Sequence, residues 1–337
     1  MKAVAYFESL AIDDPRALQD VELPEPVPGP RDLLVEVRAI SVNPVDTKVR
    51  RNTQPESGQP KVLGWDVAGV VVGVGSGVSL FKVGDEVFYA GSIARAGSNS
   101  ERHLVDERIV GRKPQSLSFA EAAALPLTAI TAWELLFERL QLVEGQGTGQ
   151  QLLIVGAAGG VGSIMLQLAR QLTEVSVIAT ASRPETQAWA RELGAHHVID
   201  HSQPLHAELQ RAGFASVSHV ASLTQTDQHF DQLVEALTPQ GRLALIDDPA
   251  QPLDVMKLKR KSLSLHWELM FTRSLFETPD MIEQHHLLQR VSQLVDQGVL
   301  RTTLGEHFGT INAANLRHAH ALLESGKAKG KIVLEGF

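Results

Sequence analysis

A glycine-rich turn between a predicted strand and a predicted helix is the segment best suited to hold a ligand. Residues 155–162 read Val-Gly-Ala-Ala-Gly-Gly-Val-Gly, directly after the apolar run 151–155. Apolar residues then recur at helical spacing from Val161 to Leu172. Such a turn brings backbone close to a pyrophosphate and presents the free N–H groups of a helix N-terminus to it. The pattern predicts a dinucleotide-binding turn; the alternative is a turn that binds nothing.

Each glycine of this turn has an expected role. Gly159 lets the backbone approach the pyrophosphate, and Gly162 lets the helix pack closely on the sheet. Ala157 stands where the first glycine of G-x-G-x-x-G usually lies. The cofactor-binding residues predicted in the turn are Gly156, Ala158, Gly159, Gly160, Val161 and Gly162.

The end of the next predicted strand indicates which nicotinamide cofactor binds. NAD-dependent proteins usually place an Asp or Glu there, on the ribose hydroxyls. Here residues 180–184 read Thr-Ala-Ser-Arg-Pro. Because Ser182 and Arg183 suit a 2′-phosphate, we expect NADPH (NADP+) as the cofactor. The alternative is that Arg183 is a solvated residue at a helix start.

The elements that position these residues alternate between strands and helices. Apolar strands are predicted at 151–155, 175–180, 197–199, 217–221 and 241–246, with helices between them. This alternation is typical of parallel pairing in a doubly wound sheet. The first third has the period-two pattern of strands instead, as in residues 35–39, and we expect the strand at 331–334 to return to that β-rich part. The predicted fold class is α/β.

Composition narrows the class of protein further. Of the 337 residues, 43% are hydrophobic and 21% are charged, as in ordinary globular proteins. The net charge of -8 and the lack of a prominent Lys/Arg run give no support to nucleic-acid or membrane binding. The chain has no cysteine, which excludes disulfides and thiolate zinc sites. No secretory signal is visible near Met1, so we expect a cytoplasmic protein.

Several further segments, in one order along the chain, carry a family resemblance. The chain resembles the zinc-free quinone oxidoreductases of the medium-chain dehydrogenase/reductase superfamily, and in particular the bacterial zinc-type alcohol dehydrogenase-like subgroup. Besides the glycine turn, the matching pieces are Ser-Val-Asn-Pro-Val-Asp-Thr at 41–47, Leu-Gly-Trp-Asp at 63–66 with the glycines of 69–77, 82–87, 125–129, 193–200, 272–275 and Gly-Lys-Ile-Val-Leu at 330–334.

The resemblance implies a GroES-like β-rich catalytic domain and a Rossmann domain with a parallel sheet. We place the first in residues 1–125 and 301–337 and the second in 126–300. It also implies a homodimer and an active site in a cleft between the domains. Leu223, Thr224 and Ile246 follow the fourth and fifth strands, at the carboxyl edge where ligands bind in open α/β sheets, and are predicted to bind the cofactor. By resemblance, further cofactor-binding residues are Thr128, His201, Phe271, Thr272 and Lys331.

Zinc is where the sequence departs from the alcohol dehydrogenases. Their catalytic metal needs a Cys and a His at the places held here by Asn43 and Trp65. An amide and an indole do not replace thiolate and imidazole as zinc ligands. Residues 91–103, where a structural zinc lobe would lie, contain no cysteine. We therefore predict no metal.

Without a metal, hydrogen-bond donors must stabilise the charge that develops on a substrate oxygen. The predicted activity is therefore hydride transfer from NADPH to a quinone, an enone or a related small carbonyl compound. By resemblance, the predicted catalytic residues are Asn43, Asp46, Lys48 and Trp65.

The roles of these four residues differ. Asn43 is the favoured orienting donor. Lys48 either donates to the oxyanion or is solvated, Asp46 lines the cleft or only fixes its loop, and Trp65 forms an apolar wall or packs in the core. Two other functions stay open: a zinc-dependent alcohol dehydrogenase, and a non-catalytic NADPH-binding or redox-sensing protein.

Overall fold

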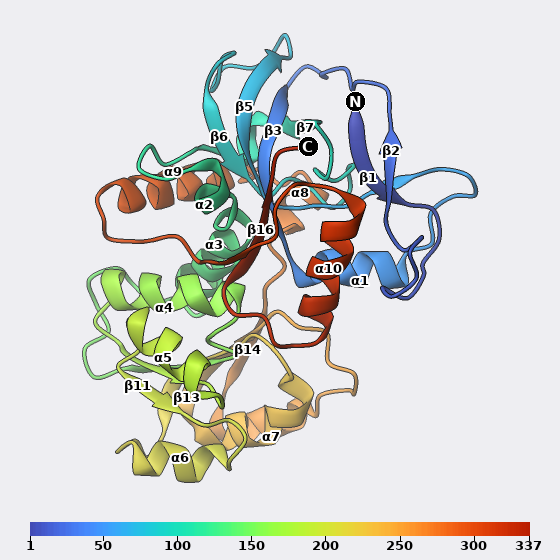
Figure 1. Cartoon of the computed structure of the whole chain (residues 1–337). Coiled ribbons are helices and arrows are strands. Elements are labelled where there is room, and N and C mark those ends of the chain that lie inside the picture. The colour runs from blue at the N-terminus through green and yellow to red at the C-terminus, as the bar shows by residue number, and fades with distance from the viewer. The chain divides into compact units, whose positions relative to one another are not determined.

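The computed structural model describes all 337 residues, which form two compact units. The first unit comprises Met1–Ile130 and Phe271–Phe337, and the second comprises Thr131–Met270. Both chain termini belong to the first unit (Figure 1).

The second boundary between the units lies earlier in the chain than the predicted one, at 271 rather than 301. Residues 271–300 add no strand to the parallel sheet, and their long helix packs in the first unit. There the Nδ1 atom of His285 lies 2.6 Å from the carbonyl oxygen of Val110. A Cβ at Gly111 would come within 2.6 Å of the Leu288 Cβ, so the helix lies close against this backbone.

The first unit is rich in strands. Its elements are β1 (Lys2–Tyr6), β2 (Gln19–Glu22), β3 (Asp32–Val42), α1 (Pro44–Asn52), β4 (Lys61–Val62), β5 (Val67–Val74), β6 (Glu86–Tyr89), β7 (Arg102–Asp106), β8 (Val110–Arg112), α2 (Phe119–Ala123), α3 (Pro126–Trp133, which crosses the unit boundary), α8 (Thr272–Leu275), α9 (Glu283–Asp296), β15 (Leu304–His307), α10 (Ala313–Glu324) and β16 (Lys331–Glu335).

The strand β3 organises the larger sheet of this unit. It has eleven residues with nearly alternating burial, and it pairs antiparallel with β5, β7 and β16. The sheet order is β15-β16-β3-β5-β6-β8, and a separate three-stranded sheet has the order β2-β1-β4. The predicted return of residues 331–334 to the β-rich part is observed, since Val333 pairs with Ser41 (Figure 1).

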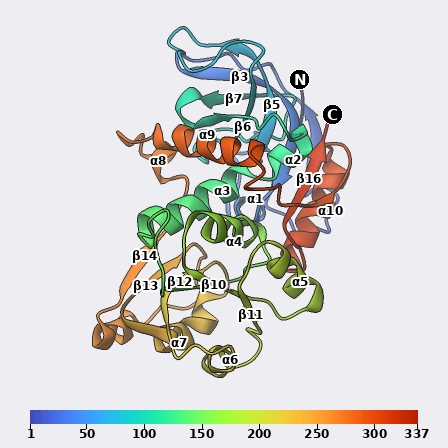
Figure 2. The same ribbon diagram turned by 90° about the vertical axis from the view of Figure 1, so that its left-hand side faces the viewer.

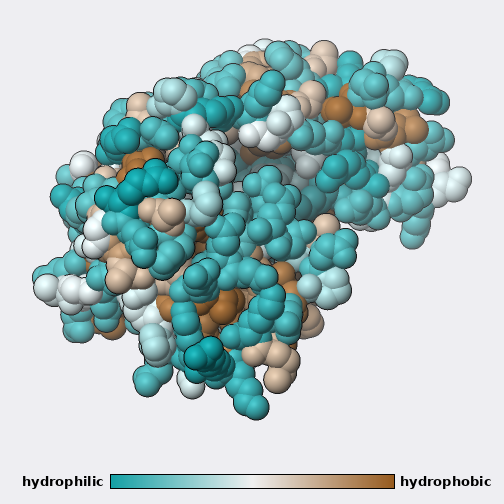
Figure 3. Space-filling view, turned by 90° about the horizontal axis from the view of Figure 1, so that it is seen from below, coloured by the Kyte–Doolittle hydropathy of each residue, from teal (hydrophilic) through white to brown (hydrophobic).

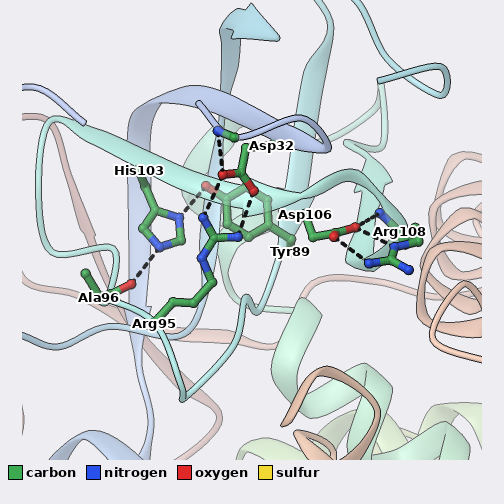
Figure 4. A network of polar contacts seen from close by, with 8 residues as sticks. Asp32, Tyr89, Arg95, Ala96, His103, Asp106 and Arg108 are labelled. Carbon is green, nitrogen blue, oxygen red and sulfur yellow. Dashed lines mark hydrogen bonds and ion pairs between the residues drawn. The ribbon is translucent and has the colours of Figure 1, made fainter. Parts of the chain in front are cut away.

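Polar side chains fix residues 91–103, the segment without cysteine. Arg95 binds both carboxylate oxygens of Asp32, at 2.8 and 3.0 Å. The ring of His103 bonds on both sides, with Nδ1 2.9 Å from the Tyr89 hydroxyl and Nε2 3.0 Å from the Ala96 carbonyl oxygen (Figure 4). This pattern suits a neutral imidazole, and burial lowers the pKa of His103 to about 4.

The second unit alternates strands and helices as the sequence predicts. Its elements are the π-helix η2 (Glu134–Arg139), β9 (Gln151–Val155), α4 (Gly160–Leu172), β10 (Ser176–Thr180), α5 (Pro184–Glu192), β11 (His197–Ile199), α6 (Leu205–Arg211), β12 (Val217–Ser222), α7 (Thr226–Ala236), β13 (Leu237–Leu245), the 3-10 helix η3 (Val255–Lys261) and β14 (Ser264–Trp267).

Six parallel strands form the sheet of this unit, in the order β11-β10-β9-β12-β13-β14. The strand order reverses next to β9, the first strand of the sheet in the chain. Helices lie on both sides of the sheet, with α4 on one side and α6 and α7 on the other (Figure 2). The α/β fold class is confirmed, because this is the doubly wound sheet that the alternation predicts.

The last strand of the sheet, β14, includes His266 and Trp267. Polar residues sit here because β14 is the edge of the sheet, where one side of the strand is unpaired and Trp267 is 53% exposed. Directly after β14, Glu268 is buried and its Oε2 lies 2.7 Å from the Nε of Arg139 on η2.

The His103 interactions predict a loss of stability in acid. His103 has a folded pKa of about 4, below the unfolded value of about 6.5, so the unfolded chain binds the proton first. Stability from this group is present above pH ~6.5 and falls by about 3 kcal/mol as the pH drops to ~4. Denaturant titrations between these pH values measure it. His103→Gln should remove this part of the slope, and an unchanged slope would contradict the assignment.

Candidate functional site

The glycine turn of the second unit is built around Gly156. This residue has φ +81°, a conformation that favours glycine. Its amide donates to the Thr180 hydroxyl at 3.2 Å, which ties the turn to the end of the neighbouring strand β10. A Cβ at Gly156 would come within 2.8 Å of the Thr224 side chain. Gly156 therefore makes the sharp turn, which explains why Ala157 is tolerated in the position where a glycine is usual.

Gly159 and Gly162 meet different surroundings. Gly159 is the N-cap of α4, with φ -72° and ψ 179°, and a Cβ there would meet only the Gly156 carbonyl oxygen at 3.5 Å. A Cβ at Gly162 would lie 2.4 Å from the carbonyl oxygen of Ala157. The space at Gly159 is open for a ligand, whereas Gly162 lies at the close contact between helix and turn.

The N-terminus of α4 has no side-chain cap. The amides of its first turn, which include those of Gly160 and Val161, therefore lack partners within the helix. The N-terminus of α7, which follows the adjacent strand β12, differs because the Asp247 carboxylate accepts the Thr226 amide at 2.8 Å. Of these two helix ends at the carboxyl edge of the sheet, only that of α4 is available to an anion, and it lies where the strand order reverses.

The remaining predicted residues of this unit lie along the same edge. Leu223 and Thr224 follow β12, and Ile246 follows β13. Ser182 is exposed after β10, and the Nε of Arg183 forms an exposed ion pair with Glu185 at 3.2 Å. The ring of His201, after β11, lies 6.2 Å from that of His229, and burial lowers its pKa. These placements suit a nucleotide lying across the ends of the strands.

In the first unit the predicted catalytic residue Asn43 contacts the buried carboxylate of Asp66. Its Oδ1 accepts the amide of Leu127 at 2.8 Å. Its Oδ2 accepts the Asn43 amide group at 2.8 Å and the Ser41 hydroxyl at 3.0 Å, and it pairs with the Lys331 ammonium at 3.0 Å. Burial raises the pKa of Asp66, and the Lys331 charge and these hydrogen bonds oppose that rise.

Asn43 is fully engaged within the protein. Its Nδ2 donates to Asp66 at 2.8 Å and to the Trp65 carbonyl oxygen at 3.4 Å, and its Oδ1 accepts from Lys331. Both amide hydrogens are therefore used, and the side chain holds the start of α1 rather than offering a free donor in this structure. This changes the role expected for Asn43 from orienting the substrate to orienting its neighbours.

Asp46 is the group of this cluster with spare hydrogen-bonding capacity. It is 1% exposed, and its Oδ2 accepts the Asn43 backbone amide at 2.6 Å. Its Oδ1 has no well-formed hydrogen bond. Burial raises the pKa of Asp46 to about 7, against the opposing effects of the Asn43 amide and the Lys331 charge. The carboxyl group can therefore hold or release a proton near neutral pH.

Trp65 is fully packed, as one of its two expected roles requires. Its Nε1 donates to the Ser92 carbonyl oxygen at 3.3 Å, and Phe271 meets its ring edge-on at 6.2 Å between centroids.

The other predicted residues of the first unit lie in different surroundings. Lys48 is half-buried on α1. Thr128 is buried and donates to the Leu125 carbonyl oxygen, and Thr272 begins α8. Asn43, Trp65 and Phe271 are thus brought into one region of the first unit.

Three contributors were missed from sequence. Asp66 stood in a quoted motif without a role, although a carboxylate beside Trp65 was the available signal. Thr180, whose hydroxyl holds the glycine turn, was read only as the end of a strand. Asp247, whose carboxylate caps α7, gave no signal in the sequence because that contact joins residues 21 positions apart.

Two family models match the chain in the expected places. The alcohol dehydrogenase GroES-like domain matches residues 29–133, and the zinc-binding dehydrogenase model matches residues 193–334. The predicted GroES-like nature of the β-rich part is thereby confirmed.

Whole-chain relatives agree with these matches. A zinc-type alcohol dehydrogenase-like protein of Staphylococcus aureus is 37% identical, covering 99% of both chains. A quinone oxidoreductase of Pseudomonas aeruginosa is 32% identical, over 96% of this chain and 97% of its own. The chain belongs to the medium-chain dehydrogenase/reductase superfamily of oxidoreductases, as its motifs predict.

Solved structures extend the comparison. A Rhizobium etli protein described as a candidate zinc-dependent alcohol dehydrogenase is 59% identical, with a TM-score of 0.96, covering 100% of this chain and 98% of its own. Escherichia coli quinone oxidoreductase complexed with NADPH is 26% identical, with a TM-score of 0.85, over 99% and 100% of the two chains. Relatives of this fold thus include both zinc-labelled proteins and quinone oxidoreductases.

The residues of this chain do not fit the zinc that the family model names. The positions of the expected thiolate and imidazole hold Asn43, whose amide is used internally, and Trp65, whose indole is buried. Asp66 already accepts four donors. The structure contains no group of three His, Cys, Asp or Glu residues able to hold a metal ion. The donor set is that of a hydrogen-bonded cluster rather than of a zinc site.

Two substitutions in the glycine turn should separate folding from binding. Gly162→Ala forces a Cβ against the Ala157 backbone, so we expect the free energy of unfolding to fall by about 2 kcal/mol. Gly159→Ala adopts an allowed conformation and should lower it by less than about 1 kcal/mol. The added methyl group of Gly159→Ala should instead weaken NADPH binding by about tenfold or more.

Denaturant titration and NADPH fluorescence measure the two effects. Unchanged NADPH affinity in a folded Gly159→Ala variant would remove the phosphates from this helix end.

Proposed function

We propose that the protein is an NADPH-dependent, metal-independent oxidoreductase that reduces a quinone, an enone or a related small carbonyl compound. The observation that carries the proposal is the uncapped helix end at Gly159, where open space meets free amides. The quinone oxidoreductase relatives, one of them in complex with NADPH, support the cofactor and the substrate class.

When bound, NADPH supplies a hydride from its nicotinamide ring. The chain's part is to bind and orient: the first-turn amides of α4 receive the pyrophosphate, while Ser182 and Arg183 receive the 2′-phosphate. Reduction of a quinone to a hydroquinone takes up one hydride and one proton. Asp46 Oδ1 is the atom at which the first unit can hold that proton near neutral pH.

A quinone panel with a metal control tests this function. Purified protein should oxidise NADPH with benzoquinones, naphthoquinones or enones, and prolonged chelation should leave the rate unchanged, because no residue set fits zinc. Loss of NADPH absorbance and elemental analysis are the measurements. Stoichiometric zinc required for alcohol oxidation would replace the proposal with a zinc-dependent alcohol dehydrogenase. Tight NADPH binding without turnover on the panel would replace it with a cofactor-binding or sensing protein.

The cofactor preference depends on Arg183 in this proposal. Its guanidinium is partly exposed and forms an ion pair with the exposed Glu185 carboxylate, with which a 2′-phosphate can compete. Arg183→Ala should weaken NADPH binding by about tenfold and leave NADH binding unchanged, because NADH lacks the phosphate. Titration with both cofactors measures the effect, and Glu185→Ala is the control that keeps the cation. Equal losses for both cofactors would assign Arg183 elsewhere.

We also propose that the protein is a cytoplasmic homodimer. The unpaired edge of β14, with exposed Trp267 and Leu269 beside it, is suited to pair with a second copy, and sedimentation equilibrium tests this.

One helical run, Phe119–Arg139, is long and apolar enough to cross a membrane, but 83% of its apolar window is buried inside the protein. The face seen from below shows separate apolar patches on a mostly hydrophilic surface (Figure 3).

A further inference from the structure

The ammonium group of Lys331 lies inside the first unit with every one of its hydrogens assigned. The residue is 3% exposed. Its Nζ lies 3.0 Å from the Val42 carbonyl oxygen and 3.0 Å from Asp66 Oδ2, and it also donates to Asn43 Oδ1. Three acceptors match the three hydrogens of an ammonium group. No hydrogen is left for the cofactor role expected of Lys331 from the family resemblance.

The three acceptors around Lys331 make an oxygen-lined cation pocket. One oxygen is a carboxylate, one an amide and one a backbone carbonyl, which are the hard oxygens that surround bound cations. Asp66 supplies the carboxylate oxygen of this pocket, and its buried negative charge needs a partner because water does not reach it. The ammonium supplies that charge from within the chain.

The pocket is connected to α1, the helix that carries Asp46 and Lys48 and begins after Asn43. Asn43 bridges it, since its Oδ1 accepts from Lys331 and its Nδ2 donates to Asp66. The backbone amide of the same residue donates to Asp46 Oδ2 at 2.6 Å, at the start of α1. Displacement of the ammonium would therefore release Asn43 and, through it, the carboxyl group of Asp46.

We propose that the Lys331 ammonium is the resident cation of this pocket, which positions Asn43 and Asp46 and leaves no ligand set for a divalent metal ion. Lys331 is thus a positioning residue for the proposed reaction and does not bind the cofactor. With the ammonium in this pocket, the chain can match the zinc-binding dehydrogenase model and still lack residues that fit zinc.

Chemical rescue of a truncated side chain tests the cation. Lys331→Ala removes the three methylene groups and the ammonium, and we expect the melting temperature to fall by roughly 10 °C, because a buried carboxylate loses its partner. Propylammonium should restore most of that loss, and the neutral isostere 1-propanol should not. The matched control is Lys113→Ala, since Lys113 is also buried and donates to the Pro114 and Leu117 carbonyl oxygens. This variant should show no specific response to propylammonium.

If Lys331→Ala does not fold, a second comparison tests the proposal, between a variant that leaves the Asp66 charge unpaired and one that removes both charges. Lys331→Met should be less stable than the double variant Asp66→Asn/Lys331→Met, in which no buried charge is unpaired. Equal stability of the single and double variants, or equal responses of Lys331→Ala to propylammonium and 1-propanol, would overturn the proposal. So would stoichiometric binding of added Co²⁺ by the unaltered protein.

Cofactor binding supplies a last readout, and this arm alone rests on the proposed function. Folded Lys331→Met should bind NADPH within about twofold of the unaltered protein, while kcat for quinone reduction falls at least about tenfold. A tenfold loss of NADPH affinity would return Lys331 to the cofactor site and overturn its positioning role. If the unaltered protein binds no NADPH, the proposed function fails, whereas the melting and metal measurements still decide the role of Lys331.

Discussion

The burial of the Asp66 carboxylate is the constraint that organises the first unit. A charged group without water contact destabilises a fold by several kcal/mol unless its lone pairs are filled. Four donors fill them here, and they come from β3, the segment after it, α3 and β16. Segments from both ends of the chain must therefore meet before this charge is compensated, which couples the C-terminal strand to the start of α1.

The second unit is governed by a different constraint, the close approach of backbone to backbone. Gly156 turns the chain through a positive φ, and Gly162 keeps the first turn of α4 against Ala157. Both features serve to leave one helix end uncapped where the strand order reverses. The neighbouring α7 is closed by Asp247, so the sheet edge offers one of these two positive helix ends to a phosphate.

Local patterns predicted the elements well because their causes are local. Hydrophobic periodicity and the glycine turn placed the strands and helices of the parallel sheet, and residue type alone showed that Asn43 and Trp65 replace the Cys and His ligands of zinc. The partners of Lys331 could not be predicted, since it meets Asn43 across 288 positions. Long-range packing also explains why the first unit includes residues 271–300, which the sequence placed with the parallel sheet: α9 packs on β8, far from it in the sequence.

Polar side chains, rather than cysteine sulfur, hold residues 91–103 in place, and this affects how the protein withstands electrophilic compounds. Quinones and enones are electrophiles that alkylate thiolates by conjugate addition, so a loop held by cysteine sulfur would be attacked by such compounds. Here Arg95 and Asp32, with Tyr89 and His103, hold the segment, and none of the 337 residues is a cysteine. A chain held together in this way presents no thiolate to the compounds it is proposed to reduce, so conjugate addition to a cysteine cannot inactivate it.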